Sequence, residues 1–115
     1  MQNKLKMTNQ VKKMKNNISK VAYLLAKSPE LINNFDLSKL NGISISFLLR
    51  KQPQLVNRFD LTKLNGWEIT CLICIQPQLI GRFNLIKLDN DNISTIISVQ
   101  PQLFDWFDID VTWYL

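Results

Sequence analysis

Two cysteines, Cys71 and Cys74, form a CxxC pair and are the first residues that suggest chemistry. Such a pair binds zinc when two further cysteines or histidines complete a tetrahedral set, and it exchanges disulfides when the thiol pKa is lowered. The chain has no third cysteine and no histidine. We therefore interpret both as ordinary reduced cysteines, and we expect neither a metal nor another cofactor.

Three aspartates, Asp36, Asp60 and Asp108, occupy one column of a repeating pattern, with Asn84 at the remaining position. A row of carboxylates suggests metal binding or acid–base catalysis. Asparagine replaces one carboxylate, however, and both residue types cap helix N-termini. Histidine, the commonest general base, is absent, and the three glycines form no phosphate-binding loop. The sequence thus predicts helix caps in this column and no enzymatic activity.

A repeat positions these residues. Four prolines are equally spaced along the chain: Pro29, Pro53, Pro77 and Pro101. They divide the chain into repeats at residues 29–52, 53–76 and 77–100, with a partial repeat at 101–115. A fixed period of this length is typical of stacked repeat units.

Each repeat has the pattern of a helix pair. In the second repeat, Pro53 begins a short helix, because proline is well tolerated in the first turn. Asp60 caps a further helical turn, and Asn65 with Glu68 resembles a capping box before a longer helix. Apolar residues of that helix are spaced i, i+3 and i+4, and the next proline ends it after Gln76. The sequence therefore predicts an all-α fold, a short α-solenoid of 24-residue helix-pair repeats.

A leucine-rich-repeat-like solenoid is the alternative, because the period and the β-branched runs ISISF and TCLICI also suit strands. The helical spacing favours helices. The longer-helix pattern also recurs before Pro29, which predicts an extra helix at about residues 17–28. We expect residues 1–10 to be a flexible basic arm and residues 11–115 to be a single helical repeat domain.

The apolar columns of the short helices predict one continuous core. Its members are Leu31, Phe35, Leu55, Phe59, Leu79, Phe83, Leu103 and Phe107. Two polar columns flank the prolines, Gln52, Gln76 and Gln100 before them and Gln54, Gln78 and Gln102 after them. We expect these glutamines to pair with backbone groups at the helix junction. For the column Lys39, Lys63 and Lys87 we expect contacts with carbonyls of the same turn or with the aspartate three residues earlier.

The 24-residue pattern PQLxxxFDLxKLNGWxIxxL, present over about residues 17–110, resembles helical repeat arrays of uncharacterised proteins from bacteria and their mobile elements. The resemblance implies a helical fold and brings no agreed activity. Together with the small size, it suggests an inhibitor or adaptor of bacterial or phage origin. An anti-CRISPR-type inhibitor is one example of that class.

The columns that vary between repeats carry aromatic residues and arginines, which are typical of protein-binding hot spots. The candidate partner-binding residues are Phe47, Arg50, Arg58, Trp67, Trp106 and Trp113. A small non-enzymatic protein-binding module is therefore the favoured function. The apolar segment 101–115 also suggests a homodimer through that end, and a monomer capped by Trp113 and Tyr114 is the alternative.

Nucleic-acid binding is the second function that the sequence suggests. Residues 1–28 carry seven lysines and no acidic residue. The candidate phosphate-binding residues are Lys12, Lys13, Lys15 and Lys20. The chain shows no signal-peptide pattern and no apolar run long enough for a bilayer, so we expect a cytoplasmic protein without membrane contact.

Overall fold

The structure, a computed structural model, describes residues 18–108. The chain divides into two compact units, Met1–Leu64 and Asn65–Leu115. Within residues 18–108 all regular structure is helical, with no strand, so the predicted all-α class is confirmed. The strand that a leucine-rich repeat requires is missing from this part of the chain. No helix within the same residues is long and apolar enough to cross a membrane.

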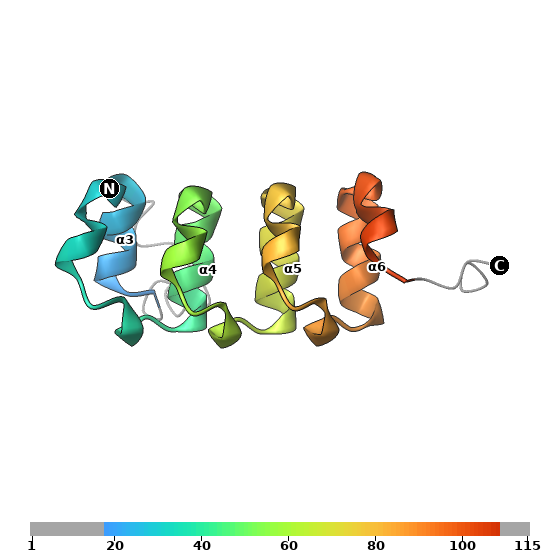
Figure 1. The fold of residues 1–115 in the computed structure, drawn as a ribbon, viewed down its shortest axis with the longest axis horizontal. Coiled ribbons are helices and arrows are strands. Elements are labelled where there is room, and N and C mark those ends of the chain that lie inside the picture. Colours follow the sequence, from blue (N-terminus) through green and yellow to red (C-terminus); the bar gives the residue numbers. More distant parts are fainter. Residues whose placement is uncertain (1–17, 109–115) are drawn as a thin grey trace, which may run out of the picture. The chain divides into compact units, whose positions relative to one another are not determined.

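In the part that the structure describes, each unit contains two α-helices connected by short 3₁₀ helices, which are labelled η. The first unit comprises α3 (Lys20–Lys27), η1 (Pro29–Asn34), η2 (Leu37–Lys39), α4 (Gly42–Lys51), η3 (Pro53–Arg58) and η4 (Leu61–Lys63). The second comprises α5 (Gly66–Ile75), η5 (Pro77–Arg82), η6 (Leu85–Lys87), α6 (Asn90–Val99) and η7 (Pro101–Trp106). The helices α3 and α4 lie side by side, as do α5 and α6 (Figure 1).

The prolines begin the short helices as predicted, since each of η1, η3, η5 and η7 has proline in its first turn. The residue before Pro53, Gln52, has φ −134° and ψ 70°, outside the α region that a following proline disfavours. These helices are 3₁₀ rather than α, and η3 ends at Arg58 because Phe59 is already extended. The short helix predicted to begin at Pro53 therefore ends before Phe59.

Side-chain caps hold the beginnings of the other helices. The Asp60 carboxylate accepts a hydrogen bond from the Thr62 amide at 3.1 Å and so begins η4. At α5 the Asn65 side chain accepts from the Glu68 amide at 2.8 Å, and Glu68 accepts from the Asn65 amide at 2.9 Å. Asp89 and Asn92 form the same reciprocal pair at α6. The capping interpretation is thus confirmed for Asp36, Asp60 and Asn84, and so is the Asn65–Glu68 capping box. The residues that Asp108 was expected to cap lie outside the described part of the chain.

The predicted extra helix before Pro29 is present but shorter than expected. It begins at Lys20, with Ser19 as N-cap, rather than at residue 17. The Ser19 amide donates to the Ser44 hydroxyl at 2.9 Å, which ties this cap to the first turn of α4. The predicted basic arm lies outside the described residues, as do three of the four candidate phosphate-binding lysines: Lys12, Lys13 and Lys15.

The core of the first unit is centred on Leu25, Ile32 and Leu48. The predicted core columns are only half-buried here and pack against that centre: Leu31, Phe35, Leu55 and Phe59. These four side chains are therefore less buried than predicted. The neighbouring column, Ile32 and Val56, is buried instead.

In the second unit the predicted columns are better buried. Leu79, Phe83 and Leu103 are all less than 9% exposed, whereas Phe107 is half-buried. They accompany the buried residues of the α-helices, Ile69, Leu72, Ile73 and Ile96. Ile93 and Ile97 occupy the same columns as Ile69 and Ile73 but are half-exposed, because within the described residues only the short η7 follows α6.

Candidate protein-binding surfaces

The cysteine pair lies on α5, with Cys71 exposed and Cys74 half-buried, and both thiols are free. Burial raises the pKa of the Cys74 thiol, and the nearby Cys71 raises it further. A raised pKa disfavours the thiolate, which is the nucleophilic and metal-binding form. Among residues 18–108 no three histidine, cysteine or acidic side chains are grouped so as to hold a metal ion.

The carboxylate of Asp36 is occupied with capping η2. It accepts from the Ser38 hydroxyl at 2.6 Å and from the Ser38 amide at 3.1 Å. These two hydrogen bonds lower the pKa of Asp36, and the charge of Lys63 lowers it further, against a small desolvation effect. A carboxylate stabilised in its ionised form is suited to capping a helix and poorly suited to donating a proton.

The Ser38→Ala variant should therefore raise the pKa of Asp36 toward its ordinary value of 3.8, because the largest cause of the lowering is removed. A carboxyl with a lowered folded-state pKa contributes stability above its unfolded-state pKa, and that stability is lost as pH falls through the folded-state pKa. Titration of the side-chain carboxyl by NMR measures the shift. The Lys63→Gln variant should raise the pKa less, and the reverse order would contradict the assignment.

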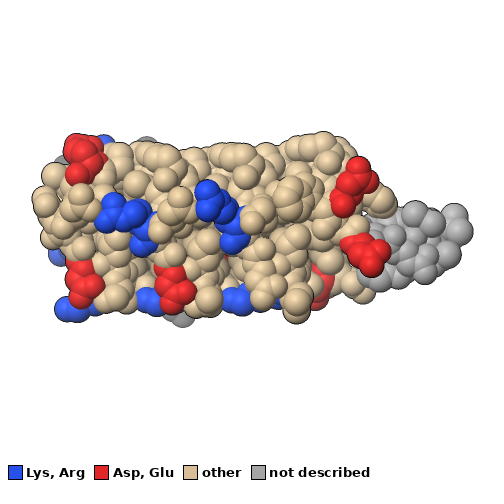
Figure 2. Space-filling view, in the orientation of Figure 1, with Lys and Arg blue, Asp and Glu red and all other residues tan. Residues whose placement is uncertain are grey.

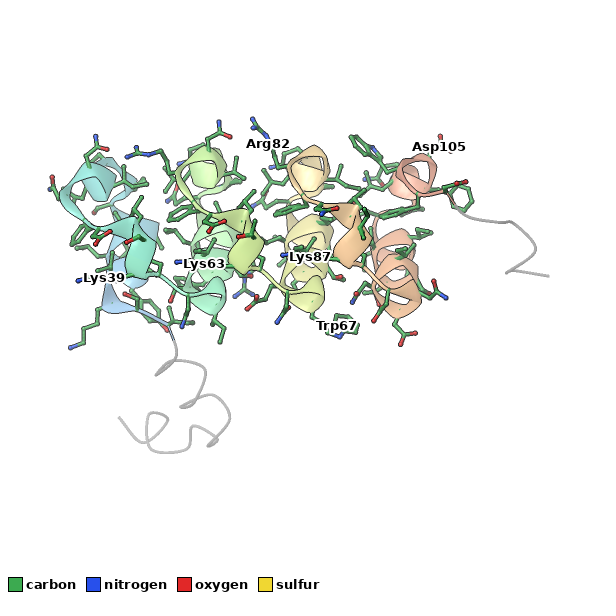
Figure 3. All side chains as sticks on the ribbon, turned by 60° about the horizontal axis from the view of Figure 1, so that its bottom comes forward. Lys39, Lys63, Trp67, Arg82, Lys87 and Asp105 are labelled. Atoms are coloured by element: carbon green, nitrogen blue, oxygen red, sulfur yellow. The ribbon has the colours of Figure 1, made fainter. Side chains whose placement is uncertain are left out.

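In the lysine column, Lys63 binds backbone carbonyls, but not those that were predicted. Lys63 Nζ donates to the carbonyls of Ser38 at 2.6 Å and Leu40 at 2.9 Å, both in the preceding repeat. The expected contact was with carbonyls of the same turn. Figure 3 shows that Lys39 and Lys63 come from the corresponding turns η2 and η4. Lys63 thus connects its turn to the preceding repeat.

The glutamine columns connect repeats in a similar way. Gln52 Nε2 donates to the carbonyl of Ala26 at 2.7 Å, and Gln52 Oε1 accepts from Gln54 Nε2 at 2.8 Å. In the second unit Gln100 Nε2 donates to the carbonyl of Cys74 at 2.7 Å, and Gln100 Oε1 accepts from Gln102 Nε2 at 2.7 Å. The acceptor is in both cases a carbonyl near the C-terminus of the preceding α-helix, where intrahelical donors run out. The predicted pairing with backbone groups is confirmed for Gln52 and Gln100. It is wrong for the column after the prolines, because Gln54, Gln78 and Gln102 each donate to the side-chain oxygen of the glutamine before the proline.

Replacing Gln52 by alanine should lower the free energy of unfolding by about 1 kcal/mol, since the Ala26 carbonyl loses its side-chain donor in a half-buried position. Urea denaturation followed by circular dichroism measures this loss. The matched control is Gln54→Ala, which removes one exposed side-chain bond and leaves the bond to Ala26 in place. Equal losses for the two variants would contradict the role given to Gln52.

A second surface follows the 3₁₀ helices. In the first unit the guanidinium of Arg58 donates to Asn33 Oδ1 at 2.6 Å, so Arg58 is held by the preceding repeat. In the second unit, Gly81 occupies the repeat column of Asn33, and Trp106 occupies the repeat column of Arg58. Gly81 and Trp106 therefore also come from adjacent repeats. A Cβ atom on Gly81 would lie 3.4 Å from the Trp106 ring. The glycine therefore leaves room for the tryptophan, which is still 52% exposed.

A third surface follows the outer sides of the α-helices, at positions spaced i, i+4 and i+8 on each helix. In the second unit we define the outer helix face as Trp67, Cys71 and Ile75 of α5 with Asp91, Thr95 and Val99 of α6. Figure 3 shows Trp67 projecting outward from the start of α5. Trp67 and Ile75 are each 54% exposed, and Val99 is 53% exposed. These three form the apolar part of the face.

In the first unit the outer helix face comprises the residues of the same columns, Tyr23 and Lys27 of α3 with Ile43, Phe47 and Lys51 of α4. Ile43 and the two lysines are exposed. The rings of Tyr23 and Phe47 pack with their centroids 4.9 Å apart and their planes tilted by 57°. Phe47 is therefore partly occupied by a structural contact, and it remains half-buried.

Of the other candidate residues, Arg50 is half-buried at the end of α4, Lys20 is exposed at the start of α3, and Trp113 lies outside the described residues. Lys and Arg side chains on the face drawn in Figure 2 form small groups with acidic and uncharged side chains between them. Sequence reasoning missed Ile75, Val99 and the 89% exposed Ile86. The sequence does contain a signal for these residues. Ile75 and Val99 stand in the column of the polar Lys51, and Ile86 stands in the column of the polar Ser38.

Comparison with known proteins adds no assignment: no family model, no curated protein and no solved structure matches this chain. The resemblance to bacterial repeat arrays therefore stays a prediction. The exposed surfaces described above are therefore the features that bear on function.

Proposed function

We propose that this chain is a non-enzymatic module that acts by binding another protein. The observation that carries the proposal is the number of large apolar side chains left at the surface of the second unit. Five of them are more than half exposed: Trp67, Ile75, Ile86, Val99 and Trp106. Exposed groups of this size mark interaction sites in soluble proteins, and tryptophan is among the commonest hot-spot residues. Their spread over several repeats fits a repeat protein that presents an extended surface.

In biological terms, the module is an inhibitor or adaptor that works in the cytoplasm of a bacterial cell, as the repeat resemblance suggests. The two free cysteines suit such a reducing compartment. Binding in this role requires no cofactor. The exposed Trp106 also fits the homodimer predicted through residues 101–115, which is the alternative to a partner protein at that end.

The experiment places a photoreactive phenylalanine analogue at position 67 or 106 in the native host and identifies crosslinked proteins by mass spectrometry. The control places it at Gln78, an exposed polar residue of η5. We expect one partner that crosslinks from 67 or 106 and not from 78, and that is lost when Trp67 and Trp106 are both replaced by serine. Equal yields from all three positions would contradict the proposal.

Nucleic-acid binding is the second candidate function. The unit Met1–Leu64 carries twelve basic and three acidic side chains, and Lys20 among them is exposed at the start of α3. Phosphate contacts by lysine give an affinity that falls steeply with added salt. Titration of labelled single-stranded and duplex DNA at about 50 mM and about 200 mM salt tests this function. Replacing Lys12, Lys13, Lys15 and Lys20 by glutamine should abolish the binding, and unchanged binding would exclude it.

A further inference from the structure

The two outer helix faces come from the same repeat columns but carry opposite charge. The face of the first unit has exposed Lys27 and Lys51 and no acidic residue, and the face of the second unit has exposed Asp91 and no basic residue. The half-buried Glu68 lies next to the second face in the first turn of α5. Both faces have apolar side chains between the charged ones. Opposite charge around matching apolar centres is the arrangement found across protein–protein interfaces.

We propose that the outer helix face of the first unit binds the outer helix face of the second unit in a second copy of this chain. The inference rests on the proposed function, since it names the partner of one of the exposed apolar surfaces. The other apolar groups, Ile86 and Trp106, belong to the 3₁₀ helices and stay accessible to an unrelated protein.

The positions of the charges fix the direction in which the helices meet. Lys27 and Lys51 are in the last turns of α3 and α4, whereas Glu68 and Asp91 are in the first turns of α5 and α6. An antiparallel arrangement places the lysines of one copy against the acidic groups of the other. It also places the negative ends of two helix dipoles against the positive ends of two others. A parallel arrangement would separate the opposite charges by the length of a helix.

The apolar residues supply the centre of the contact. Ile43 and the Tyr23–Phe47 pair of one copy meet Trp67, Ile75 and Val99 of the other. Every copy carries one face of each kind, so a pair of copies that exchanges both faces has two equivalent contacts. The proposed product is this closed two-fold dimer, in which each face has the same environment in both copies.

A charge exchange tests the pairing directly. Variant one carries Lys27→Glu and Lys51→Glu, and variant two carries Asp91→Lys and Thr95→Lys; Glu68 is left unchanged because it forms the capping box of α5. Each variant alone presents two faces of like charge, so each should sediment at 13.4 kDa, whereas the native chain should sediment at twice that mass. An equimolar mixture of the two variants restores opposite charge at both contacts and should sediment as the dimer. Unchanged melting curves verify that both variants fold.

The result that overturns the inference is a native chain that stays at 13.4 kDa even at high micromolar concentration, or variants that dimerise alone as well as in the mixture. The Trp67→Ser/Ile75→Ser variant should raise the dissociation constant at least tenfold, as expected for central apolar residues. The matched control is Trp106→Ser, which removes an equally exposed tryptophan from η7 and should leave the dimer intact. Loss of the dimer in this control alone would assign it to residues 101–115 instead.

The outcome separates this inference from the proposed function. A monomer whose position 67 crosslinks an unrelated protein would overturn self-association and leave the binding module in place. A dimer that crosslinks only to itself, from both 67 and 106, would support self-association and contradict the binding of another protein.

Discussion

Replacing Leu48 by alanine should lower the free energy of unfolding by about 3–5 kcal/mol, the upper part of the range for a fully buried leucine. Leu48 is 0% exposed and contacts the buried centre formed with Leu25 and Ile32. The loss combines the transfer free energy of the removed methyl groups with the cost of the cavity left between α3, η1 and α4. Urea denaturation measured by circular dichroism gives this value.

The chain contains a matched control for this substitution. Leu24 occupies the same repeat column as Leu48, one repeat earlier, but it is 42% exposed on α3. The Leu24→Ala variant should therefore cost less than about 1 kcal/mol, as surface substitutions usually do. Equal losses at the two positions would show that residue type rather than burial decides the cost.

The Gly66→Ala variant should destabilise the second unit by about 1–3 kcal/mol, the usual cost of forcing extra atoms into a packed site. Gly66 begins α5, and a Cβ atom there would lie 2.8 Å from Asn92 Oδ1 and 3.0 Å from the Lys87 carbonyl. Asn92 Oδ1 cannot retreat easily, because it accepts the Asp89 amide in the capping box of α6. Helix propensity alone predicts the opposite sign, a gain of up to about 1 kcal/mol.

Gly81→Ala is the control for Gly66→Ala. Its Cβ would lie 3.4 Å and 3.9 Å from two ring atoms of Trp106, which is ordinary packing distance. Neither glycine has a positive φ, so alanine fits the backbone at both. The control should gain about 0.5 kcal/mol, because alanine lowers the entropy of the unfolded chain. A stabilised Gly66→Ala protein in thermal melts would disprove the close approach at α5.

Features that depend on residues within a few positions of one another could be predicted from the sequence. Proline at the start of each short helix, Asp60 as a cap and the Asn65–Glu68 capping box all follow from local rules, and all are present. The 3₁₀ winding of the short helices was not predictable, because the same residues also satisfy an α-helical pattern. The burial of the phenylalanine after each of these helices was not predictable either: Phe59 is half-buried, whereas Phe83 in the same column is buried.

Features that depend on neighbouring repeats were harder to predict. Lys63 was expected to bind its own turn, and it binds carbonyls of the repeat before it. Leu24 and Leu48 share a column but differ in exposure, 42% against 0%, and Leu48 belongs to the buried centre with Leu25 and Ile32. The only sequence signal for the exposure of Ile75 and Val99 was that both replace the polar Lys51 of their repeat column. A single sequence does not distinguish such a departure from ordinary variation.

The side-chain hydrogen bonds that join neighbouring repeats within each unit all connect residues about one repeat apart in the sequence. This short reach has a consequence for synthesis on the ribosome. A repeat can complete its bonds as soon as the repeat after it has emerged, since no partner from a distant part of the chain is needed. Domains that depend on distant contacts must wait for most of their sequence and expose apolar surface meanwhile. Each unit is therefore expected to acquire its structure in the order of translation, with little more than one repeat unprotected at any time.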